Sequence, residues 1–574
     1  MASVTAMSHP LHQTLIPMPR PRALFLTPLI LLAACGGGTD ATPPAAKDSP
    51  GGTLVISTAG GPDNLLPPLT VQNAGLQVED LVFQRLATVG AALNVVGDAG
   101  FSPDLATSWD WAKDSLSIVF HLDPNARWHD GGRVTAADVA FTFALYKDPK
   151  TAAAAAAQLM NIDSVSARDS VTAVFWFAKR TPYQFFEATM QMQIVPAHLL
   201  RSLDRATLAS APFASQPVGS GPFRLVRWES GKTVELVADT TGGRRRARLD
   251  RVIFTQSPDP VTAYTRVATG EADVYEAVRP DKVAEVVRNP QLTFILAPTL
   301  NYTFLVLNLV DPATGKPHPV FGDRAVRRAL TMATDRRSIV ANIYDSLAVQ
   351  ARGPFTSAQA SADTTLKPLP YAVDSANKLL DAAGWMRGAD SLRRRNGKVL
   401  GFAIAVPSSS VARMRASVLL QEQFRRVGAD VKIESTDNSA FGARMVARNF
   451  DATIASWAQD AGPANARDAW TSAAAAKGLN NFGAYRSPAF DAELDSALTV
   501  MSADESHTHF AHAWKVITDD APAIWLAEPR LAMVINSRFV TTGMRNDSWW
   551  AGIPKWYIPA DKRIARDAPA AVAR

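Results

Sequence analysis

Cysteine is almost absent from this chain of 574 residues, because Cys35 is its single example. A lone cysteine cannot form an internal disulfide. Long hydrophobic runs are missing too, since the most apolar stretch, residues 23–34, is well short of the ~20 residues that cross a bilayer as a helix. No later segment is apolar enough to cross one. The remaining composition, with 47% hydrophobic and 20% charged residues, is typical of a globular protein.

The N-terminal segment has the pattern of an export signal. Arg20 and Arg22 precede the apolar stretch, and small residues lead to Cys35. A positive region, a short apolar region and a small-residue cleavage site together predict a signal peptide over residues 1–35. The ending Leu-Ala-Ala-Cys resembles a lipobox, in which the cysteine becomes the lipid-bearing first residue of the mature chain. The alternative interpretation is a tail anchor or a chance apolar stretch.

The start of this leader is open, and a spacer follows it. Translation begins either at Met1 or at Met18, which opens a compact positive region. Residues 36–50 are rich in Gly, Pro, Ala and Thr and lack apolar periodicity, a composition that predicts a flexible tether. We therefore expect an exported, extracytoplasmic (periplasmic) protein that a lipid at Cys35 anchors to a membrane, without indication of which leaflet.

Charge of one sign does not dominate the chain. The 59 Lys and Arg residues against 53 Asp and Glu residues give a formal net charge of +6. The two densest basic runs, residues 244–246 and 393–395, are flanked by Gly and Asn, which predicts solvated loops. They could instead meet acidic surfaces. Nucleic-acid binding is hard to reconcile with export and is not expected.

Strand and helix patterns alternate along the mature chain. Strands are expected at residues 52–57, 115–122, 170–177, 221–228, 233–238, 251–256, 400–406, 430–434 and 452–456, and helices at 76–86, 135–148, 260–269, 281–287, 323–334, 336–344, 374–383 and 412–427. Thr135 followed by Asp138 is a variant of the capping box. Interleaved strands and helices without an internal repeat predict an α/β architecture with mixed sheets.

Several short motifs follow one another in a fixed order. They lie at residues 103–109, 119–122, 126–139, 218–223, 270–273, 321–330, 376–385, 450–457 and 519–524, and include Trp-His-Asp-Gly-Gly at 128–132. In this order and spacing they resemble the bacterial extracellular solute-binding protein family 5, whose members include oligopeptide-, dipeptide- and nickel-binding proteins. The resemblance covers nearly all of the chain from Gly51 to about Pro559.

The resemblance implies the two-lobed periplasmic-binding-protein fold (type II) of the large peptide-binding subclass, with an extra subdomain. It assigns residues 51–88, 212–301 and 525–574 to the first lobe, 89–211 to the extra subdomain and 302–524 to the second lobe. The chain would leave the subdomain near Ala211, cross between lobes near Tyr302 and return near Ile524. Such lobes close by a hinge on a ligand held between them.

The resemblance also indicates where the ligand binds. In peptide-binding members, an acidic residue three positions after a tryptophan pairs with the free amino terminus of the peptide, and Trp457-Ala-Gln-Asp460 matches this spacing. Strand ends present ligand contacts in α/β sheets, and a buried ammonium needs a partner carboxylate. This implies that Asp460 is that carboxylate and that Trp457 lines the pocket beside it. The alternative for Asp460 is a helix cap or an exposed loop acid.

Four other aromatic residues are candidates for the apolar wall of the pocket or for plain core: Tyr302, Trp470, Tyr485 and Trp525. The polar and acidic companions common in peptide binders are missing after Asp460, where Ala-Gly-Pro follows. Ligands other than peptides therefore stay open, namely a nickel chelate, haem, an opine or an oligosaccharide.

Catalytic and metal-binding patterns are weak. His507, His509 and His512 form a dense cluster in which His509 and His512 could share a helix face, but no Cys or Glu completes a recognisable metal set, so a solvated face is expected. No catalytic triad is visible either, which disfavours a secreted hydrolase. Together with the absence of such patterns, the resemblance to family 5 implies a monomeric binding protein without enzyme activity, metal or cofactor, which delivers peptides or another small solute to the permease subunits of an ABC importer.

Overall fold

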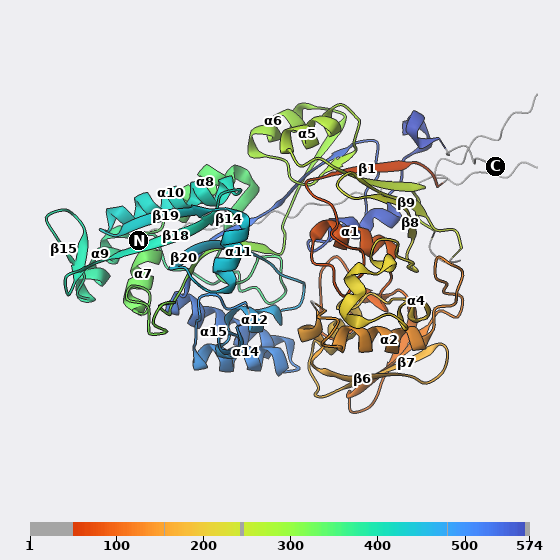
Figure 1. Ribbon diagram of the computed structural model, residues 1–574, viewed down its shortest axis with the longest axis horizontal. Coiled ribbons are helices and arrows are strands. Elements are labelled where there is room, and N and C mark those ends of the chain that lie inside the picture. Colours follow the sequence, from red (N-terminus) through yellow and green to blue (C-terminus); the bar gives the residue numbers. More distant parts are fainter. Residues whose placement is uncertain (1–49, 154, 242–245, 479, 569–574) are drawn as a thin grey trace, which may run out of the picture. The chain divides into compact units, whose positions relative to one another are not determined.

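The computed structural model describes residues 50–153, 155–241, 246–478 and 480–568 (Figure 1). The expected signal peptide, Cys35 and all but the last residue of the expected tether lie outside these ranges. None of the helices within the ranges is both long enough and apolar enough to span a membrane.

The first of two large sheets is mixed and has seven strands. Its order is β12 (Leu292–Ala297), β22 (Leu531–Asn536), β11 (Val274–Tyr275), β1 (Thr53–Thr58), β10 (Arg251–Gln256), β9 (Thr233–Ala238) and β8 (Phe223–Glu229). β1 runs parallel to β10 and β11, while the other neighbours are antiparallel. The associated helices are α1 (Asn73–Val82), α5 (Pro260–Ala268) and α6 (Pro280–Arg288). β8 and β9, which correspond to the strands expected at residues 221–228 and 233–238, pair antiparallel as a hairpin.

The second large sheet has six strands and is also mixed. Its order is β14 (Ala348–Gln350), β21 (Ala523–Pro529), β13 (Asn301–Leu307), β20 (Ala452–Ala458), β18 (Gly401–Pro407) and β19 (Asp430–Thr436). Its core also buries side chains of α7 (Arg324–Ala333), α8 (Arg336–Ile343), α9 (Val373–Ala382) and α10 (Val411–Arg426). The remaining elements of this region are α11 (Asn438–Val446), α12 (Asn465–Trp470), α13 (Ser472–Lys477), α14 (Pro488–Thr499), α15 (Ala503–Asp520) and a small sheet of β15 (Met386–Arg387), β16 (Arg393–Arg395) and β17 (Lys398–Val399).

A third body of structure is inserted after α1. It contains the paired strands β2 (Ala87–Val89) and β3 (Phe101–Pro103), and an antiparallel sheet in the order β4 (Ala106–Trp111), β5 (Ser117–Leu122), β7 (Thr172–Phe177) and β6 (Ile162–Ala167). Three helices accompany them: α2 (Ala136–Lys147), α3 (Gln184–Met190) and α4 (Ala197–Leu200). The predicted capping box at the start of α2 is confirmed, because the Thr135 amide donates to the Asp138 carboxylate over 2.8 Å.

Short 3-10 helices lie at Ala156–Leu159, Arg205–Ser210, Pro212–Ala214, Asp345–Leu347, Trp549–Lys555, Ala560–Lys562 and Ala565–Asp567. Two short segments connect the two large sheets. Residues 298–300 lead from β12 to β13, and Arg530 alone separates β21 from β22. The chain therefore leaves the second sheet about five residues later than the predicted Ile524, because β21 keeps pairing with β14 up to Pro529. The wider division of the chain into lobes stays a prediction.

Close backbone contact explains the glycines that precede β8. A Cβ at Gly219 would lie 1.9 Å from the carbonyl oxygen of Val82, so only glycine fits there. His129 holds the same turn, since its Nδ1 accepts from the Gly219 amide and its Nε2 lies 3.0 Å from the Gly221 carbonyl oxygen. Burial lowers the pKa of His129, which suits the neutral ring that this pattern needs. The His-Asp-Gly-Gly motif thus has a structural role.

The expectation of a solvated loop at residues 393–395 is wrong for Arg393. Its side chain is 2% exposed and lies in β16, where the guanidinium donates to Asp381, to Asn377 and to the backbone oxygens of Trp385 and Val427. The flanking Gly and Asn residues indicated a loop, but tertiary hydrogen bonds bury this one arginine. Of the other basic run only Arg246 is described; it is largely exposed and lies 3.5 Å from Asp250.

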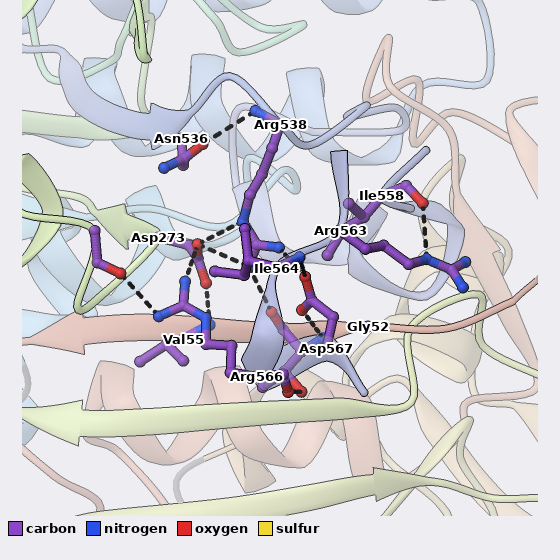
Figure 2. A network of polar contacts seen from close by, with 12 residues as sticks. Gly52, Val55, Asp273, Asn536, Arg538, Ile558, Arg563, Ile564, Arg566 and Asp567 are labelled. Carbon is purple, nitrogen blue, oxygen red and sulfur yellow. Dashed lines mark hydrogen bonds and ion pairs between the residues drawn. The ribbon is translucent and has the colours of Figure 1, made fainter. Parts of the chain in front are cut away.

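A buried network of charges joins the C-terminal residues to the first sheet (Figure 2). Asp273 is fully buried and accepts from the Val55 amide over 2.9 Å and from the Arg538 Nε over 3.1 Å. Arg538 also pairs with Asp567, whose other oxygen accepts from the Thr53 amide over 2.9 Å. Because these carboxylates accept hydrogen bonds from amides of β1, the network connects the C-terminal segment to this strand.

Candidate functional site

Asp460 lies just beyond the end of β20. That strand pairs with β13 so that Trp457 stands opposite Tyr302, and the strand ends at Ala458. The next amide, of Gln459, still donates to the Leu300 oxygen over 2.9 Å, which holds the chain against the crossing segment 298–300. Asp460 is thereby placed at a strand end next to the connection between the two large sheets.

The Asp460 side chain is partly buried, and its carboxylate is poorly satisfied. Its Oδ2 accepts a hydrogen bond of 3.1 Å from the Nε2 of Gln191, which directly follows α3 in the inserted body. Its Oδ1 is closed to solvent and has no hydrogen-bond partner among the described residues. Among the described residues, no basic side chain forms an ion pair with the Asp460 carboxylate. Asp460 is therefore neither an exposed loop acid nor the side-chain cap of a described helix.

Burial raises the pKa of Asp460 to about 6, and the negative charge of Asp547 adds to the rise. The hydrogen bond from Gln191 works in the opposite direction, as do polar groups of Gly462 and Asn465. Asp547 itself is paired with Arg545, with the two N–O distances at 2.9 and 3.0 Å. A buried carboxyl group with an amide partner and another acid nearby would be stabilised by an added cation.

The predicted aromatic residues gather behind the strand. Trp457 is half-buried and stacks on Phe482, with 5.6 Å between ring centroids. Tyr302 is fully buried, and its hydroxyl accepts from the indole nitrogen of Trp470 over 3.2 Å. Trp525 meets the edge of Trp470 at 5.0 Å. These four predicted residues form one aromatic cluster, although Tyr302, Trp470 and Trp525 are core in this structure.

Tyr485 belongs to a different environment. Its ring is buried against Phe490, and its hydroxyl donates to Asp520 over 2.7 Å. Burial raises the pKa of the Tyr485 hydroxyl, so the group stays a neutral donor. Its predicted place in the ligand pocket remains a prediction without a contact to the Asp460 region.

The inserted body meets the second sheet's region close to Asp460. Phe186 of α3 packs against Gly462 so tightly that a Cβ on this glycine would lie 2.6 Å from the phenyl ring. The Tyr183 hydroxyl lies 3.4 Å from the hydroxyl of Ser506 in α15. The Phe186–Gly462 contact and the Gln191–Asp460 hydrogen bond thus bring the inserted body against the segment that carries Asp460.

Two large cavities lie elsewhere. One of 510 Å³ is lined by residues of the inserted body and the first sheet, among them Leu105, Thr107 and Pro222. The other, of 760 Å³, lies beside β14 and includes Gln350 and Glu528. Neither cavity is lined by Asp460 or Trp457.

The sequence did not predict that Gln191, Asp547 and Phe186 lie near Asp460. Gln191 reaches Asp460 across 269 positions, and no local motif marks it. Asp547 stands in an irregular segment after β22. Only the tertiary fold brings these residues to the carboxylate, so a single sequence offers no signal for them.

The expectation that no Glu accompanies the histidine cluster is also wrong. Glu493 of α14 lies 2.7 Å from the Nδ1 of His509 and 3.6 Å from the Nδ1 of His512. The three residues offer ligand atoms that all lie within 4.8 Å of one another. The glutamate was overlooked because it belongs to the preceding helix, whereas helical spacing relates only residues of one helix face.

Comparison with known proteins agrees with this architecture. The chain is 26% identical to the oligopeptide-binding protein AppA of Bacillus subtilis over 544 residues, which are 92% of this chain and 96% of that protein. The structure of AppA from Bacillus subtilis in complex with a nonapeptide is similar with a TM-score of 0.77 and 22% identity, over 89% of this chain and 99% of that one. The structure of NikZ from Campylobacter jejuni with Ni(L-His) gives a TM-score of 0.75 and 23% identity, over 89% and 100% of the chains.

Both solved structures are two-lobed binding proteins, and the predicted two-lobed α/β fold is confirmed. The model of one family, described as "Bacterial extracellular solute-binding proteins, family 5 Middle", matches residues 100–478, well over half of the chain. The match spans most of the inserted body, most of the second sheet and the Trp457–Asp460 segment. The chain therefore belongs to the bacterial extracellular solute-binding proteins of family 5.

Proposed function

We propose that this protein is the extracytoplasmic substrate-binding component of an ABC importer, which captures peptides between its lobes and delivers them to a membrane permease. Family membership and the similarity to an oligopeptide-binding protein support this proposal. The protein holds its solute without making or breaking bonds. We further propose that it acts as a monomer tethered by a lipid at Cys35.

The single observation that carries the peptide assignment is the state of Asp460. A carboxylate removed from water without a cationic partner is costly, and pairing with a buried ammonium would offset that cost. The α-amino group of a peptide has the charge and size to take the place of the Gln191 amide, which holds one oxygen of Asp460 over 3.1 Å. The other oxygen, which no described residue contacts through a hydrogen bond, is free to accept a second N–H.

Closure of the lobes would complete the site. The segments 298–300 and Arg530 are the only covalent connections between the two large sheets in the described chain, which suits a hinge. Gln191 and Phe186 approach Asp460 and Gly462 from the inserted body, so a ligand enters when these contacts open. Trp457 and the aromatic cluster behind it would supply an apolar wall with few polar groups, as ligand sites commonly do.

A nickel chelate is the second candidate, because the solved structure of NikZ contains Ni(L-His). Such a ligand also carries an amino group or imidazole that an acid can hold. The two classes are separated by mass spectrometry of the small molecules released when the purified protein is denatured. Peptides in the released fraction support the proposal, and a metal chelate without peptides contradicts it.

The affinity for a cationic ligand should depend on pH through Asp460. The ligand pairs with the ionised carboxylate, whose pKa burial raises to about 6 in the free protein. As the pH falls below 6, each unit should weaken binding about tenfold, because protonation competes with the ligand. Calorimetric titration of a tripeptide between about pH 5 and pH 7.5 measures this slope. A constant affinity over that range would contradict the assignment of Asp460.

Substitution of Gly462 should hinder closure at the contact with Phe186, and its new Cβ would also lie 3.3 Å from the Oδ1 of Asp460. In Gly462→Ala the new Cβ meets the Phe186 ring at 2.6 Å, and such overpacking costs about 1–3 kcal/mol, or roughly a 5- to 150-fold loss of peptide affinity. Gly442→Ala is the matched control, because a Cβ there meets nothing within 4 Å. Calorimetry measures the peptide affinity of both variants. Equal affinities would show that the contact between Phe186 and Gly462 does not affect binding.

A further inference from the structure

A second polar cluster lies on the hairpin of α14 and α15, two helices that Figure 1 labels. The two helices are joined by residues 500–502 and pack against each other. Glu493 is eight positions before the middle of this connection, and His509 is eight positions after it. The two side chains therefore stand at the same level of the hairpin, where His509 and Glu493 approach to 2.7 Å.

His512 completes the cluster from the same helix as His509. Residues three apart on a helix are neighbours on its surface, so both imidazoles face Glu493. The Nδ1 of His512 lies 3.6 Å from the glutamate oxygen, and its ring stands almost perpendicular to that of His509 at a centroid distance of 6.5 Å. All three ligand atoms lie within 4.8 Å of one another.

We propose that Glu493, His509 and His512 form a surface site for a divalent transition-metal ion such as Zn²⁺. Bond lengths of about 2.0–2.2 Å in a tetrahedral zinc site separate neighbouring ligand atoms by about 3.4 Å. The two distances from Glu493, 2.7 and 3.6 Å, lie on either side of that separation, so small side-chain rotations suffice to admit an ion. Two imidazoles and one carboxylate suit zinc, copper or nickel better than calcium or magnesium.

The cluster is accessible to solvent, and the neighbouring lysine does not pair with its glutamate. His512 is 59% exposed, and the other two side chains are about one third exposed, which leaves room for water on the open side of the ion. Lys515, one turn further along α15, is held by Asp519 over 2.6 Å and does not occupy the glutamate. A bound ion would cross-link α14 to α15 and so stabilise the helix that leads into β21.

The test uses the full mature chain without a histidine tag and Zn²⁺ alone as the probe. Calorimetry should show one ion bound, and thermal unfolding should shift to higher temperature in its presence. His512→Ala and Glu493→Gln should each weaken binding by at least about tenfold and remove the thermal shift. His507→Ala is the matched control, because this histidine lies on the same helix but contacts the Ala360 oxygen instead.

Both variants concern partly exposed side chains, so the fold should persist, and circular dichroism without metal verifies this. Absence of binding to the unaltered chain at about millimolar Zn²⁺ would overturn the proposal. So would full retention of binding by His512→Ala, or an equal loss in His507→Ala. Peptide binding does not enter any of these measurements, so the outcome is independent of the proposed function.

Discussion

Asp460→Asn should weaken the binding of a peptide with a free amino terminus by about 3–5 kcal/mol, which is roughly a 150- to 5000-fold loss of affinity. The substitution preserves the shape of the side chain but removes the charge that an ammonium needs in a buried setting. Calorimetric titration near neutral pH measures the loss. A matched control is Asp468→Asn in the neighbouring helix α12, which removes the same charge from a half-buried position.

The stability of the ligand-free protein separates loss of the site from loss of the fold. Because the pKa of Asp460 is raised to about 6 by burial, the folded state binds more protons than the unfolded state between the ordinary pKa of an aspartic acid and 6. This group's contribution to stability therefore falls as the pH rises through that window, by up to about 3 kcal/mol. Asp460→Asn should thus unfold at a higher temperature than the unaltered chain at neutral pH. Unchanged peptide affinity, or a destabilised variant, would contradict the proposed role of the carboxylate.

Arg538→Met should lower the free energy of unfolding by about 3–5 kcal/mol, because it leaves Asp273 and Asp567 as buried acids with fewer partners. Arg566, which also pairs with Asp273, can compensate only for that one acid. The free energy of unfolding of Arg538→Lys should lie between those of Arg538→Met and the unaltered chain, since a single ammonium cannot replace the guanidinium that bridges both carboxylates.

Denaturant unfolding of the mature chain measures these changes. Arg279→Met is the control, because Arg279 forms an ion pair with Asp281 in which both side chains are more than half exposed. Such surface pairs contribute little, so this variant should unfold like the unaltered chain. Equal stability of Arg538→Met and Arg279→Met would show that the network in Figure 2 does not hold the terminal segment in place.

Local patterns predicted the regular elements well. The strand expected at residues 251–256 coincides with β10, and that at 233–238 coincides with β9, because apolar residues alternate there between clear turn residues. Helix ends were less exact: the helix expected at 76–86 ends at Val82, where the chain turns into an extended segment below Gly219. The carbonyl oxygen of Val82 accepts a hydrogen bond from the distant Gly221 amide over 2.8 Å, and local periodicity carries no information about this contact.

The candidate site was predicted only in part, for the same reason. The spacing of Trp457 and Asp460 singled out the carboxylate, but Gln191 and Phe186 lie far away in the sequence and meet it only in the folded chain. Arg393 was expected to be solvated because its neighbours are typical of loops, yet four polar groups from other segments bury it. Patterns in a single sequence predict the helix or strand to which a residue belongs. The missed neighbours of Asp460 and the burial of Arg393 both depend on contacts between different elements.

The central claim is that Asp460 holds the cationic end of a solute enclosed by the closing lobes. Its most direct test is a calorimetric comparison, near neutral pH, of one tripeptide with a free amino terminus and the same tripeptide acetylated at that terminus. We predict that acetylation weakens binding to the unaltered chain by at least about 100-fold, and that Asp460→Asn no longer distinguishes the two peptides. Equal affinity of the unaltered chain for both peptides would contradict the claim.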